Sequence, residues 1–377
     1  MERRIEAEVR VLIEMGHSVV VATSPFPGSK PWVKNILEIG ALYLQWKPYK
    51  FIERGHFGWP FRWLAILGSE RIAREKFDLA VICLPWNFIG MSMAYVLSYL
   101  RVPFVVAVHC QFGKAQLLPI SEACLVKAMS CCVGGYGVSK PVTSRFLDLY
   151  RTFLPENCLV ETIPNGVDVD HFKPEMQTRQ DIRTRLGLRA DSFVLIFCGR
   201  LDPMKRPCFA GEVFGQWAQK VPSSRLLVVG SGPEEASMRE VLRAKGVLEK
   251  TVFIGSVSDT APYYAASDCF LSTSSSEGFP LVVAEAASSG LPMLLPDDDL
   301  FRSIYGQCDS AQFACADEVD DWVQKLQLLF QQNSECRAQF AFVSREFAIG
   351  NLSLISMNKR LCLFYASVLS RLSQQAD

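Results

Sequence analysis

Short apolar runs bounded by turn residues recur along the whole chain, and stretches of helical character separate them. They fall into two groups. The first group comprises residues 17–23, 77–84, 102–109 and 131–139, and the second comprises residues 192–200, 224–232, 251–257, 269–274 and 292–296. Parallel strands are buried on both faces and need long crossover connections. This alternation therefore predicts parallel sheets with helices on both faces.

The segment between the two groups, TIPNGVDVDHFKPEMQTRQD, is rich in Pro, Asn, Asp and other polar residues. A chain of 377 residues is long enough for two domains, each with its own core. We therefore predict a domain boundary near residue 170, with an N-terminal domain over residues 1–169 and a second domain over residues 170–353. Where two such domains face one another, ligands bind in the cleft at the carboxyl ends of the strands.

Charge and cysteine usage narrow the class of protein. Lys and Arg together number 39, as do Asp and Glu, so no global charge favours nucleic acid as a partner. The 13 cysteines are odd in number and contain no Cys-x-x-Cys pair. This indicates reduced thiols in a cytoplasmic protein rather than a disulfide framework or a zinc site. The opening residues, MERRIEAEVR, are too charged for a signal peptide.

One uncharged segment, residues 79–100, is long enough to span a bilayer. Pro85 and Asn87 interrupt it after a short run, and another apolar run follows directly after Arg101. We therefore favour a buried strand, a loop, a helix and a second strand over a membrane span.

The stretch SSSEGFPLVVAEAASSGLP contains two carboxylates, Glu277 and Glu285. Pro280 suits a helix start, so we expect a helix from Pro280 to Gly290, with Glu277 in the preceding loop. The carboxylates would then lie roughly 10 Å apart, too far for a tight acid–base pair. They could instead hold hydroxyls at both ends of a nucleotide diphosphate sugar, with N–H groups of the helix start near its phosphates. A solvated loop Glu and a capping-turn Glu are the alternative.

Basic residues and a histidine follow two other predicted strands. The motif GRLDPMKRP places Arg200, Lys205 and Arg206 at the carboxyl end of its strand. Arg and Lys suit a departing diphosphate there, and a solvated basic loop is the alternative. His109 ends the run VPFVVAVH and should point into the cleft, where a functional and a structural role are equally compatible with the sequence.

Three further patterns carry less weight. We interpret Gly230 and Gly232 of GSGPEE as a tight turn, because the acidic residues that follow would repel a dinucleotide pyrophosphate. The triplet at residues 297–299, Asp-Asp-Asp, predicts a solvated turn rather than a metal site. Residues 43–63 interleave aromatic residues with Lys and Arg. This suits an interfacial membrane contact or an amphiphilic ligand, or alternatively core aromatics flanked by cations.

Taken in order, these motifs resemble those of the retaining glycosyltransferases of family four, which have the GT-B fold: two Rossmann-like domains facing across a cleft. The resemblance rests on IPNGVDVDHFKP, GRLDPMKRP, LLVVGSGPE, VFIGSV and YYAASDCFLSTSSSEGFPLVVAEAASSGLP. It covers nearly the whole chain and is strongest over residues 160–295. Alongside these other motifs, two Glu residues separated by seven others within EGFPLVVAEA are a specific signal of this family.

The resemblance implies roles for individual residues. Arg200 and Lys205 would bind the donor diphosphate, Glu285 the ribose hydroxyls, and Glu277 the hydroxyls of the donor sugar. His109 would be the catalytic residue of the first domain. Further donor contacts would come from backbone groups of Gly278, Phe279, Pro280 and Leu281. The resemblance also implies that no metal or other cofactor is needed, and that a final helix over about 354–377 returns to the N-terminal domain.

Two departures from the family pattern carry expectations. In the family, a strand and a Gly-rich loop precede the helix that ERRIEAEVRVLIEMGH resembles, whereas Met1 stands here where that loop ends. The missing strand would occupy the middle of the first sheet, so its neighbours should lack pairing partners and an upstream extension should fold better. Activity of this chain is correspondingly in question. In addition, LLPDDDLFRSIYG replaces the family's Gly-rich turn.

The function predicted from the resemblance is retaining transfer of a sugar from a nucleotide donor, most readily UDP-linked, to a glycan or lipid-linked acceptor. Cell-envelope polysaccharide or lipopolysaccharide synthesis is the expected setting, in the cytoplasm with a peripheral contact at the inner face of the membrane. Two alternatives stay open. One is an inactive truncated relative that serves as a nucleotide-binding partner subunit, and the other is a sugar-nucleotide epimerase of the same fold.

Overall fold

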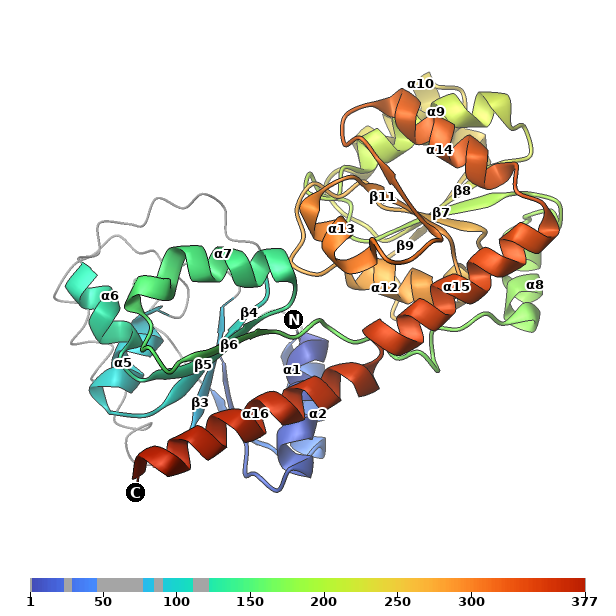
Figure 1. Ribbon diagram of the computed structural model, residues 1–377. Helices are drawn as coiled ribbons and strands as arrows, with labels where there is room; N and C mark the ends of the chain where they lie inside the picture. Colours follow the sequence, from blue (N-terminus) through green and yellow to red (C-terminus); the bar gives the residue numbers. More distant parts are fainter. Residues whose placement is uncertain (1, 24–28, 46–76, 85–90, 111–121, 377) are drawn as a thin grey trace. The chain divides into compact units, whose positions relative to one another are not determined.

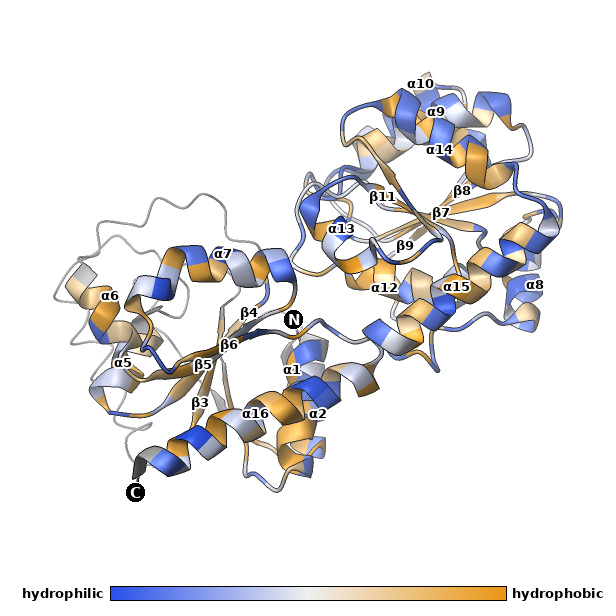
Figure 2. Ribbon diagram, in the orientation of Figure 1, coloured by the Kyte–Doolittle hydropathy of each residue, from blue (hydrophilic) through white to orange (hydrophobic). Residues whose placement is uncertain are grey.

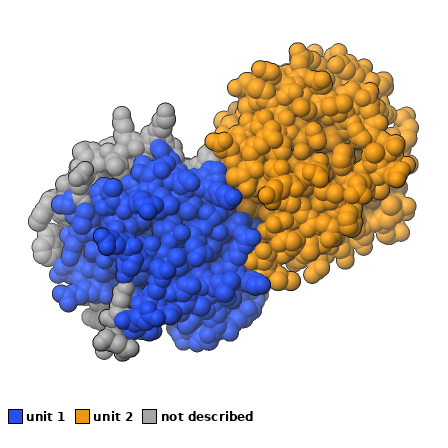
Figure 3. Space-filling model, in the orientation of Figure 1, with its two compact units in different colours: residues 1–165, 357–377 blue, residues 166–356 orange. Residues whose placement is uncertain are grey.

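The computed structural model describes residues 2–23, 29–45, 77–84, 91–110 and 122–376. The chain forms two compact units (Figure 3). Unit 1 comprises residues 1–165 and 357–377, and unit 2 comprises residues 166–356. The first crossing between units thus lies a few residues before the predicted boundary at residue 170.

Unit 1 contains parallel strands in two sheets (Figure 1). A four-stranded sheet has the order β3-β4-β5-β6, and β1 pairs with β2 in a separate sheet. The strands are β1 (Val20–Thr23), β2 (Leu42–Gln45), β3 (Ala80–Leu84), β4 (Phe104–Val108), β5 (Cys132–Gly137) and β6 (Leu159–Thr162). The described helices are α1 (Glu2–Glu14), α2 (Ser29–Glu38), α5 (Met91–Tyr99), α6 (Glu122–Met129), α7 (Lys140–Tyr150) and α16 (Leu354–Ala376), with a 3-10 turn at Arg151–Phe153.

The described strands of unit 1 form one sheet of two strands and one sheet of four. Among the described residues, β1 pairs only with β2 and β3 pairs only with β4. One edge of β1 and one edge of β3 therefore have no strand partner in the described part of unit 1.

Helices cover both faces of the four-stranded sheet, and two adjacent glycines of β5 show this directly. A Cβ on Gly134 would lie 3.1 Å from the side chains of Phe364 and Val368 in α16. A Cβ on Gly135 would instead lie 3.5 Å from Phe146 in α7. Successive residues of a strand face opposite sides, so α16 and α7 pack on opposite faces of the sheet. The C-terminal helix is thus part of unit 1.

Unit 2 is built on a six-stranded parallel sheet with the order β12-β11-β10-β7-β8-β9. The strands are β7 (Val194–Cys198), β8 (Arg225–Val229), β9 (Thr251–Gly255), β10 (Cys269–Leu271), β11 (Met293–Pro296) and β12 (Ala311–Ala314). The helices are α8 (Met176–Arg185), α9 (Pro207–Lys220), α10 (Glu235–Ala244), α11 (Ala261–Ala265), α12 (Leu281–Ser288), α13 (Asp299–Tyr305), α14 (Val319–Phe330) and α15 (Ser334–Leu352), with a 3-10 turn at Leu248–Lys250. Its central strands are the apolar segments in Figure 2, and every residue of β7 is buried.

The strand order of unit 2 fixes where a ligand site can form. The chain starts at β7, adds β8 and β9 on one side, and then returns to add β10, β11 and β12 on the other. The connections after β7 and β10 therefore run in opposite directions and leave a crevice at the carboxyl ends of these neighbouring strands. GRLDPMKRP follows β7 and STSSSEGFP follows β10, so both motifs lie at this switch point.

All nine predicted apolar runs contain a strand, and residues 79–100 contain β3 followed by α5. In the ranges described above, no helix is long and apolar enough to cross a membrane. The prediction missed β2, β6 and β12. Each of these is the end strand of its sheet. Edge strands are short and carry more polar residues, so their apolar signal is weak.

Candidate functional site

Hydrogen bonds fasten the loop after β7 to the loop after β10. The Thr273 hydroxyl donates to the carbonyl of Lys205 at 2.8 Å, and the N–H of Ser275 donates to the carbonyl of Met204 at 2.8 Å. These contacts are made by serine and threonine in STSSSEG with the backbone of GRLDPMK. The polar residues of one motif thus hold the other motif at the switch point.

Lys205 and Glu277 form an ion pair between these two loops. The Ser274 hydroxyl also donates a hydrogen bond of 2.8 Å to Glu277 Oε1. The Lys205 side chain is 22% exposed and that of Glu277 11% exposed, so Glu277 is not the solvated loop residue of the alternative interpretation. The two side chains are therefore largely buried and paired with one another.

The other basic residues of the motif behave differently. The Arg200 side chain is 73% exposed, and its Nε lies 3.7 Å from Asp202. Arg206 donates to Asp317 at 2.6 Å and stacks on the Phe209 ring with its guanidinium carbon 4.4 Å from the ring centroid. Arg206 thus has structural partners, whereas Lys205 alone of the three contacts a predicted ligand-binding carboxylate.

Glu285 is buried within α12, with 7% of its surface exposed. The Tyr264 hydroxyl donates to Glu285 Oε2 at 3.0 Å, and Thr260 Oγ1 lies 3.5 Å from the same oxygen. Burial, Cys198 and Glu285 raise the pKa of Tyr264, so the phenol stays protonated and remains a donor. A buried carboxylate held by a tyrosine is not a solvated capping residue, and this part of the alternative interpretation is wrong.

The helix between the two carboxylates is shorter than predicted. It was expected from Pro280 to Gly290, but α12 spans Leu281–Ser288, with Pro280 as the N-cap. Gly290 has a φ of +74°, the left-handed conformation that commonly ends a helix. Tyr305 donates from its hydroxyl to the Pro280 carbonyl at 3.3 Å and holds the helix start in place.

Both carboxylates lie near this helix start. Glu277 and Glu285 each contribute to the raised pKa of Tyr305, after burial, which is the main cause. Their charges therefore act on the same phenol. At the start of α12 the N–H of Val283 donates to the Pro280 carbonyl at 3.0 Å, and the N–H groups of Leu281 and Val282 have no acceptor inside the helix. An anion at this point would have both these donors and the Lys205 ammonium nearby.

The glycines of GSGPEE allow two loops to touch. Gly230 has a φ of +134°, and a Cβ there would lie 1.9 Å from the carbonyl oxygen of Gly199. A Cβ on Gly232 would lie 2.3 Å from the carbonyl oxygen of Leu201. The predicted tight turn is therefore correct, and it packs the loop after β8 directly against the backbone that carries Arg200.

The aspartate triplet has structural partners. Asp297 accepts two hydrogen bonds from Arg302, at 2.7 and 2.8 Å. Asp298 caps α13 by accepting the N–H of Phe301 at 2.8 Å. Among the residues whose positions are described, no group of three or more His, Cys, Asp or Glu side chains could hold a metal ion. The predicted independence from metal stays a prediction.

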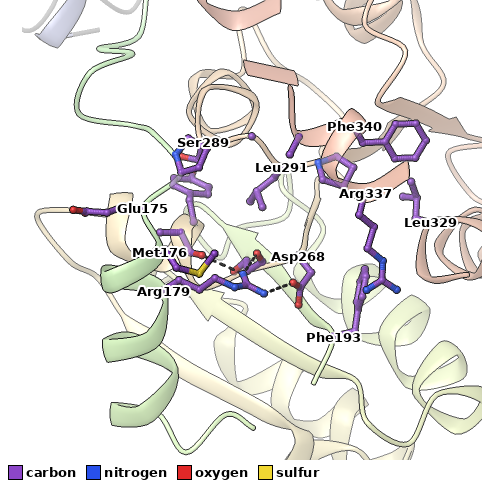
Figure 4. A pocket seen from close by; sticks show the side chains of 17 residues that line it. Glu175, Met176, Arg179, Phe193, Asp268, Ser289, Leu291, Leu329, Arg337 and Phe340 are labelled. Carbon is purple, nitrogen blue, oxygen red and sulfur yellow. Dashed lines mark hydrogen bonds and ion pairs between the residues drawn. The ribbon is translucent and has the colours of Figure 1, made fainter. Parts of the chain in front are cut away.

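A cavity of about 210 Å³ in unit 2 lies away from these residues (Figure 4). Phe193, Asp268 and Pro292 line it, and each directly precedes a strand, namely β7, β10 and β11. The cavity therefore lies at the amino ends of the strands, opposite the switch point. Its polar wall contains the ion pair between Arg179 and Asp268, and none of the predicted site residues lines it.

His109 belongs to unit 1, where it directly follows β4. Its ring meets the Tyr136 ring edge to face with 6.5 Å between centroids. Its buried Nε2 has no hydrogen-bond partner among the described residues. Burial, followed by the charge of Arg4, lowers the pKa of His109 to about 3. The imidazole is therefore neutral near pH 7, with a nitrogen able to accept a hydrogen bond.

This pKa predicts a specific titration behaviour. An unfolded histidine titrates near 6.5, so as the pH falls from 6.5 towards 3 the unfolded state takes up a proton that folded His109 does not. We expect the His109 ring signals in an NMR titration to stay constant between pH 5 and 8. His109 should also lower the free energy of unfolding progressively as the pH falls below 6.5. His109→Gln should remove this part of the loss of stability in acid. Titration of His109 near its ordinary value would contradict this description.

Comparisons with known proteins agree with the fold. The family model for glycosyl transferases group 1 matches residues 178–345, and that for glycosyltransferase family 4 matches residues 1–171. A solved glycosyltransferase from Rickettsia africae ESF-5 superimposes with a TM-score of 0.80 at 16% identity, covering 98% of this chain and 94% of that one. Anabaena Alr3699/HepE, solved in complex with UDP, gives 0.74 at 16% identity, covering 96% of each chain.

A curated relative from Escherichia coli is similar over a shorter part. It is named UDP-Gal:alpha-D-GlcNAc-diphosphoundecaprenol alpha-1,3-galactosyltransferase and is 33% identical over 140 residues, which is 36% of each chain. This chain spans about half the length, or less, of most of the curated relatives that it matches. The two family models nevertheless adjoin one another and cover both units. The switch-point motifs, the two parallel-sheet units and these matches together show that the chain belongs to the glycosyltransferases of family four and has the GT-B fold.

Proposed function

We propose that this protein transfers a sugar from a UDP-sugar to a glycan or lipid-linked acceptor with retention of anomeric configuration. The observation that carries the proposal is the Lys205–Glu277 pair beside the start of α12, with Glu285 buried in the same helix. Family membership supports the reaction type. Anabaena Alr3699/HepE was solved with UDP and the E. coli relative is named for a UDP-Gal donor, which supports UDP as the nucleotide.

The chemistry assigned to unit 2 is donor binding and stabilisation of the leaving group. In this proposal the ammonium of Lys205 turns from Glu277 to the donor diphosphate, whose negative charge grows as the glycosidic bond breaks. The N–H groups of Gly278, Phe279 and Leu281 and the exposed Arg200 add donors to the same anion. Glu277, released from Lys205, then accepts hydroxyl groups of the donor sugar.

Glu285 is assigned to the ribose. Its carboxylate is acceptor-only and can accept several hydrogen bonds at once. Tyr264 already orients one of its oxygens, so the carboxylate is held in place before the nucleotide arrives. A pre-oriented acceptor pair suits the two vicinal hydroxyls of a ribose.

His109 is assigned to the reaction centre in unit 1. As a neutral imidazole it can accept a hydrogen bond from a sugar hydroxyl. Retention follows from attack of the acceptor hydroxyl on the same face that the diphosphate leaves, with the leaving phosphate accepting the acceptor's proton. No metal is assigned a role.

The acceptor and the cellular location of the reaction are proposed by comparison with a relative. The E. coli relative is named for a diphosphoundecaprenol-linked substrate, which favours a lipid-linked acceptor and synthesis of a cell-envelope glycan. Such an acceptor would place the enzyme at the cytoplasmic face of a membrane. The aromatic and basic stretch at 43–63 that would suit this contact lies outside the described residues from residue 46 onwards.

Nucleotide binding tests the donor site directly. We expect UDP to bind more tightly than GDP or ADP in calorimetry, and Glu285→Ala to weaken UDP binding by about 10- to 100-fold. This corresponds to the loss of one hydrogen bond to a charged group, at about 1.5–3 kcal/mol. Glu346→Ala, which removes an exposed carboxylate from α15, is the matched control and should bind UDP normally.

Two other results would change the assignment. A folded protein that binds no nucleotide would contradict the donor site and favour a partner subunit without activity. A protein that binds UDP and consumes a UDP-sugar to give an isomeric UDP-sugar, without any acceptor, would favour an epimerase. Transfer that requires an added acceptor is the result expected for a glycosyltransferase.

A further inference from the structure

Two buried polar side chains without hydrogen-bond partners lie around the Tyr136 ring in unit 1. Arg4, in the first turn of α1, is 3% exposed, and Nε, Nη1 and Nη2 are all buried without an acceptor among the described residues. Its guanidinium carbon lies 5.2 Å from the Tyr136 ring centroid. His109, whose Nε2 is also buried and unpaired, contacts the same ring edge to face.

The second buried arginine among the described residues shows what such a side chain needs. In unit 2, Arg183 is 5% exposed, and each of its three nitrogens has an acceptor. Nε donates to the carbonyl of Ala266 at 2.9 Å, Nη1 to that of Ser192 at 3.1 Å and Nη2 to Asp268 at 2.7 Å. A guanidinium stays charged and has five N–H donors, so burial without acceptors is strongly unfavourable. Arg4 has none of the acceptors that Arg183 has.

The buried carboxylate in the same helix, Glu8, is held by other partners. Glu8 lies one helical turn after Arg4 and is also buried. Its oxygens accept the hydroxyl of Tyr136, 2.8 Å away, and the hydroxyl of Tyr365 in α16. The two tyrosines therefore hold Glu8, whose charge offsets part of the Arg4 charge without accepting any of its N–H donors. The donors of Arg4 are left for a ligand.

The free donors specify the kind of ligand. All three nitrogens of Arg4 lack acceptors in the part of unit 1 that the structure describes. A carboxylate offers two oxygens, whereas a phosphoryl group offers three in a tetrahedral arrangement and forms charge-assisted bonds with guanidinium groups. The neutral imidazole of His109 contacts the same tyrosine ring. It offers one more nitrogen, either to the bound phosphoryl group or to a hydroxyl of the ligand next to that group.

We propose that Arg4 binds a phosphoryl group of the acceptor next to His109. This inference rests on the proposed function, in which the donor diphosphate is bound by Lys205 in unit 2. The acceptor class is then a sugar or lipid that carries a phosphate near the hydroxyl to be glycosylated. Arg4 acts here as a specificity-determining and positioning residue, because it holds the acceptor beside His109 without touching the bond that forms.

The test uses inorganic phosphate as the probe and the whole chain as the sample. We expect phosphate to bind to the wild type in calorimetry in the presence of saturating UDP, since the two sites are separate. Arg4→Met, which keeps the length of the side chain but not its charge, should weaken phosphate binding at least tenfold, and Arg4→Lys should retain part of it. Arg10→Met removes an exposed arginine from the same helix and should bind phosphate like the wild type.

Thermal unfolding distinguishes a ligand-binding role from a structural one. A ligand that binds only the folded state raises Tm, so phosphate should raise the Tm of the wild type and not that of Arg4→Met. Without phosphate, Arg4→Met removes an unpaired buried charge but also leaves the buried Glu8 without the cation that offsets it, so the phosphate-dependent change in Tm, and not the Tm alone, tests the ligand-binding role. A lower Tm for Arg4→Met, combined with no effect of phosphate on either protein, would show a structural role and overturn the proposal.

UDP binding measured on the same samples separates this inference from the proposed function. Normal UDP binding together with no phosphate binding, or with phosphate binding that Arg4→Met leaves unchanged, contradicts the phosphoryl site alone. Phosphate binding that depends on Arg4 in a protein without UDP binding contradicts the donor site and supports only an anion site at Arg4. Phosphate binding that saturating UDP abolishes would place the phosphate in the donor site and overturn the assignment to the acceptor.

Discussion

Replacing Lys205 by methionine is expected to lower the rate of donor turnover by about 100- to 1,000-fold, the typical effect of removing one group that stabilises a developing negative charge. The ammonium of Lys205 is the half-buried cation at the switch point and pairs with Glu277 in the absence of ligand. Its loss should act mainly on the transition state, where the diphosphate leaves. The measurement is the rate of UDP release from UDP-glucose, UDP-galactose and UDP-N-acetylglucosamine.

The substitution also leaves Glu277 as a half-buried carboxylate without its partner, so a loss of stability must be separated from a loss of catalysis. The double variant Lys205→Met, Glu277→Gln removes both charges and is expected to unfold like the wild type while remaining slow. Lys220→Met, on the exposed end of α9, is the control for a lost lysine. An increase in KM with an unchanged kcat would mean that Lys205 binds the donor equally in the ground and transition states, contrary to its assigned role.

Asp268→Ala is expected to reduce the free energy of unfolding by about 3–5 kcal/mol, the usual cost of removing one partner from a buried ion pair. Asp268 accepts hydrogen bonds from Arg179 at 2.5 Å, from Arg183 at 2.7 Å and from the N–H of Val194 at 2.7 Å. It therefore joins α8 to the start of β7, and its loss leaves the guanidinium groups of Arg179 and Arg183 short of an acceptor. The contact between Asp268 and Arg179 is visible in the cavity wall in Figure 4.

Urea unfolding measures this effect, with Asp191→Ala as the matched control. Asp191 also pairs with an arginine, Arg189, but both side chains are more than half exposed. An exposed pair contributes about 0.2–1 kcal/mol, so the control should be close to the wild type. If Asp268→Ala and Asp191→Ala lost similar free energy, the network around Asp268 would not be the buried anchor described here.

The framework of both units could be predicted from local pattern. Apolar runs such as VLIFC and FVVAV are continuous because parallel strands are buried on both faces, and this property is visible in any short window of sequence. Edge strands lack that signal, which is why β2, β6 and β12 were missed. The site motifs were also found by local pattern, since each follows a predicted strand.

The pairing of side chains could not be predicted in the same way. The sequence places Arg200, Lys205 and Arg206 within seven residues, yet only Lys205 reaches Glu277, while Arg206 turns to Asp317. Which of three neighbouring cations faces the site depends on loop conformation and on hydrogen bonds with a strand about 70 residues away in the chain. Neither the loop conformation nor these hydrogen bonds can be read from the spacing of residues in the sequence.

Arg4 and Glu8 illustrate the same limit over a longer distance. In sequence they are ordinary charged residues of an amphipathic helix, and nothing in their spacing marks them as buried. Glu8 is held by a tyrosine 357 positions later in the chain, and Arg4 stacks on a tyrosine of β5. By itself, the sequence determined the fold class, the switch-point motifs and the residue types that suit a nucleotide sugar, because these depend on local periodicity and chemistry. Only the tertiary structure decided which charged groups are buried, which are paired and which keep donors for a ligand, because those properties depend on contacts between segments far apart in the chain.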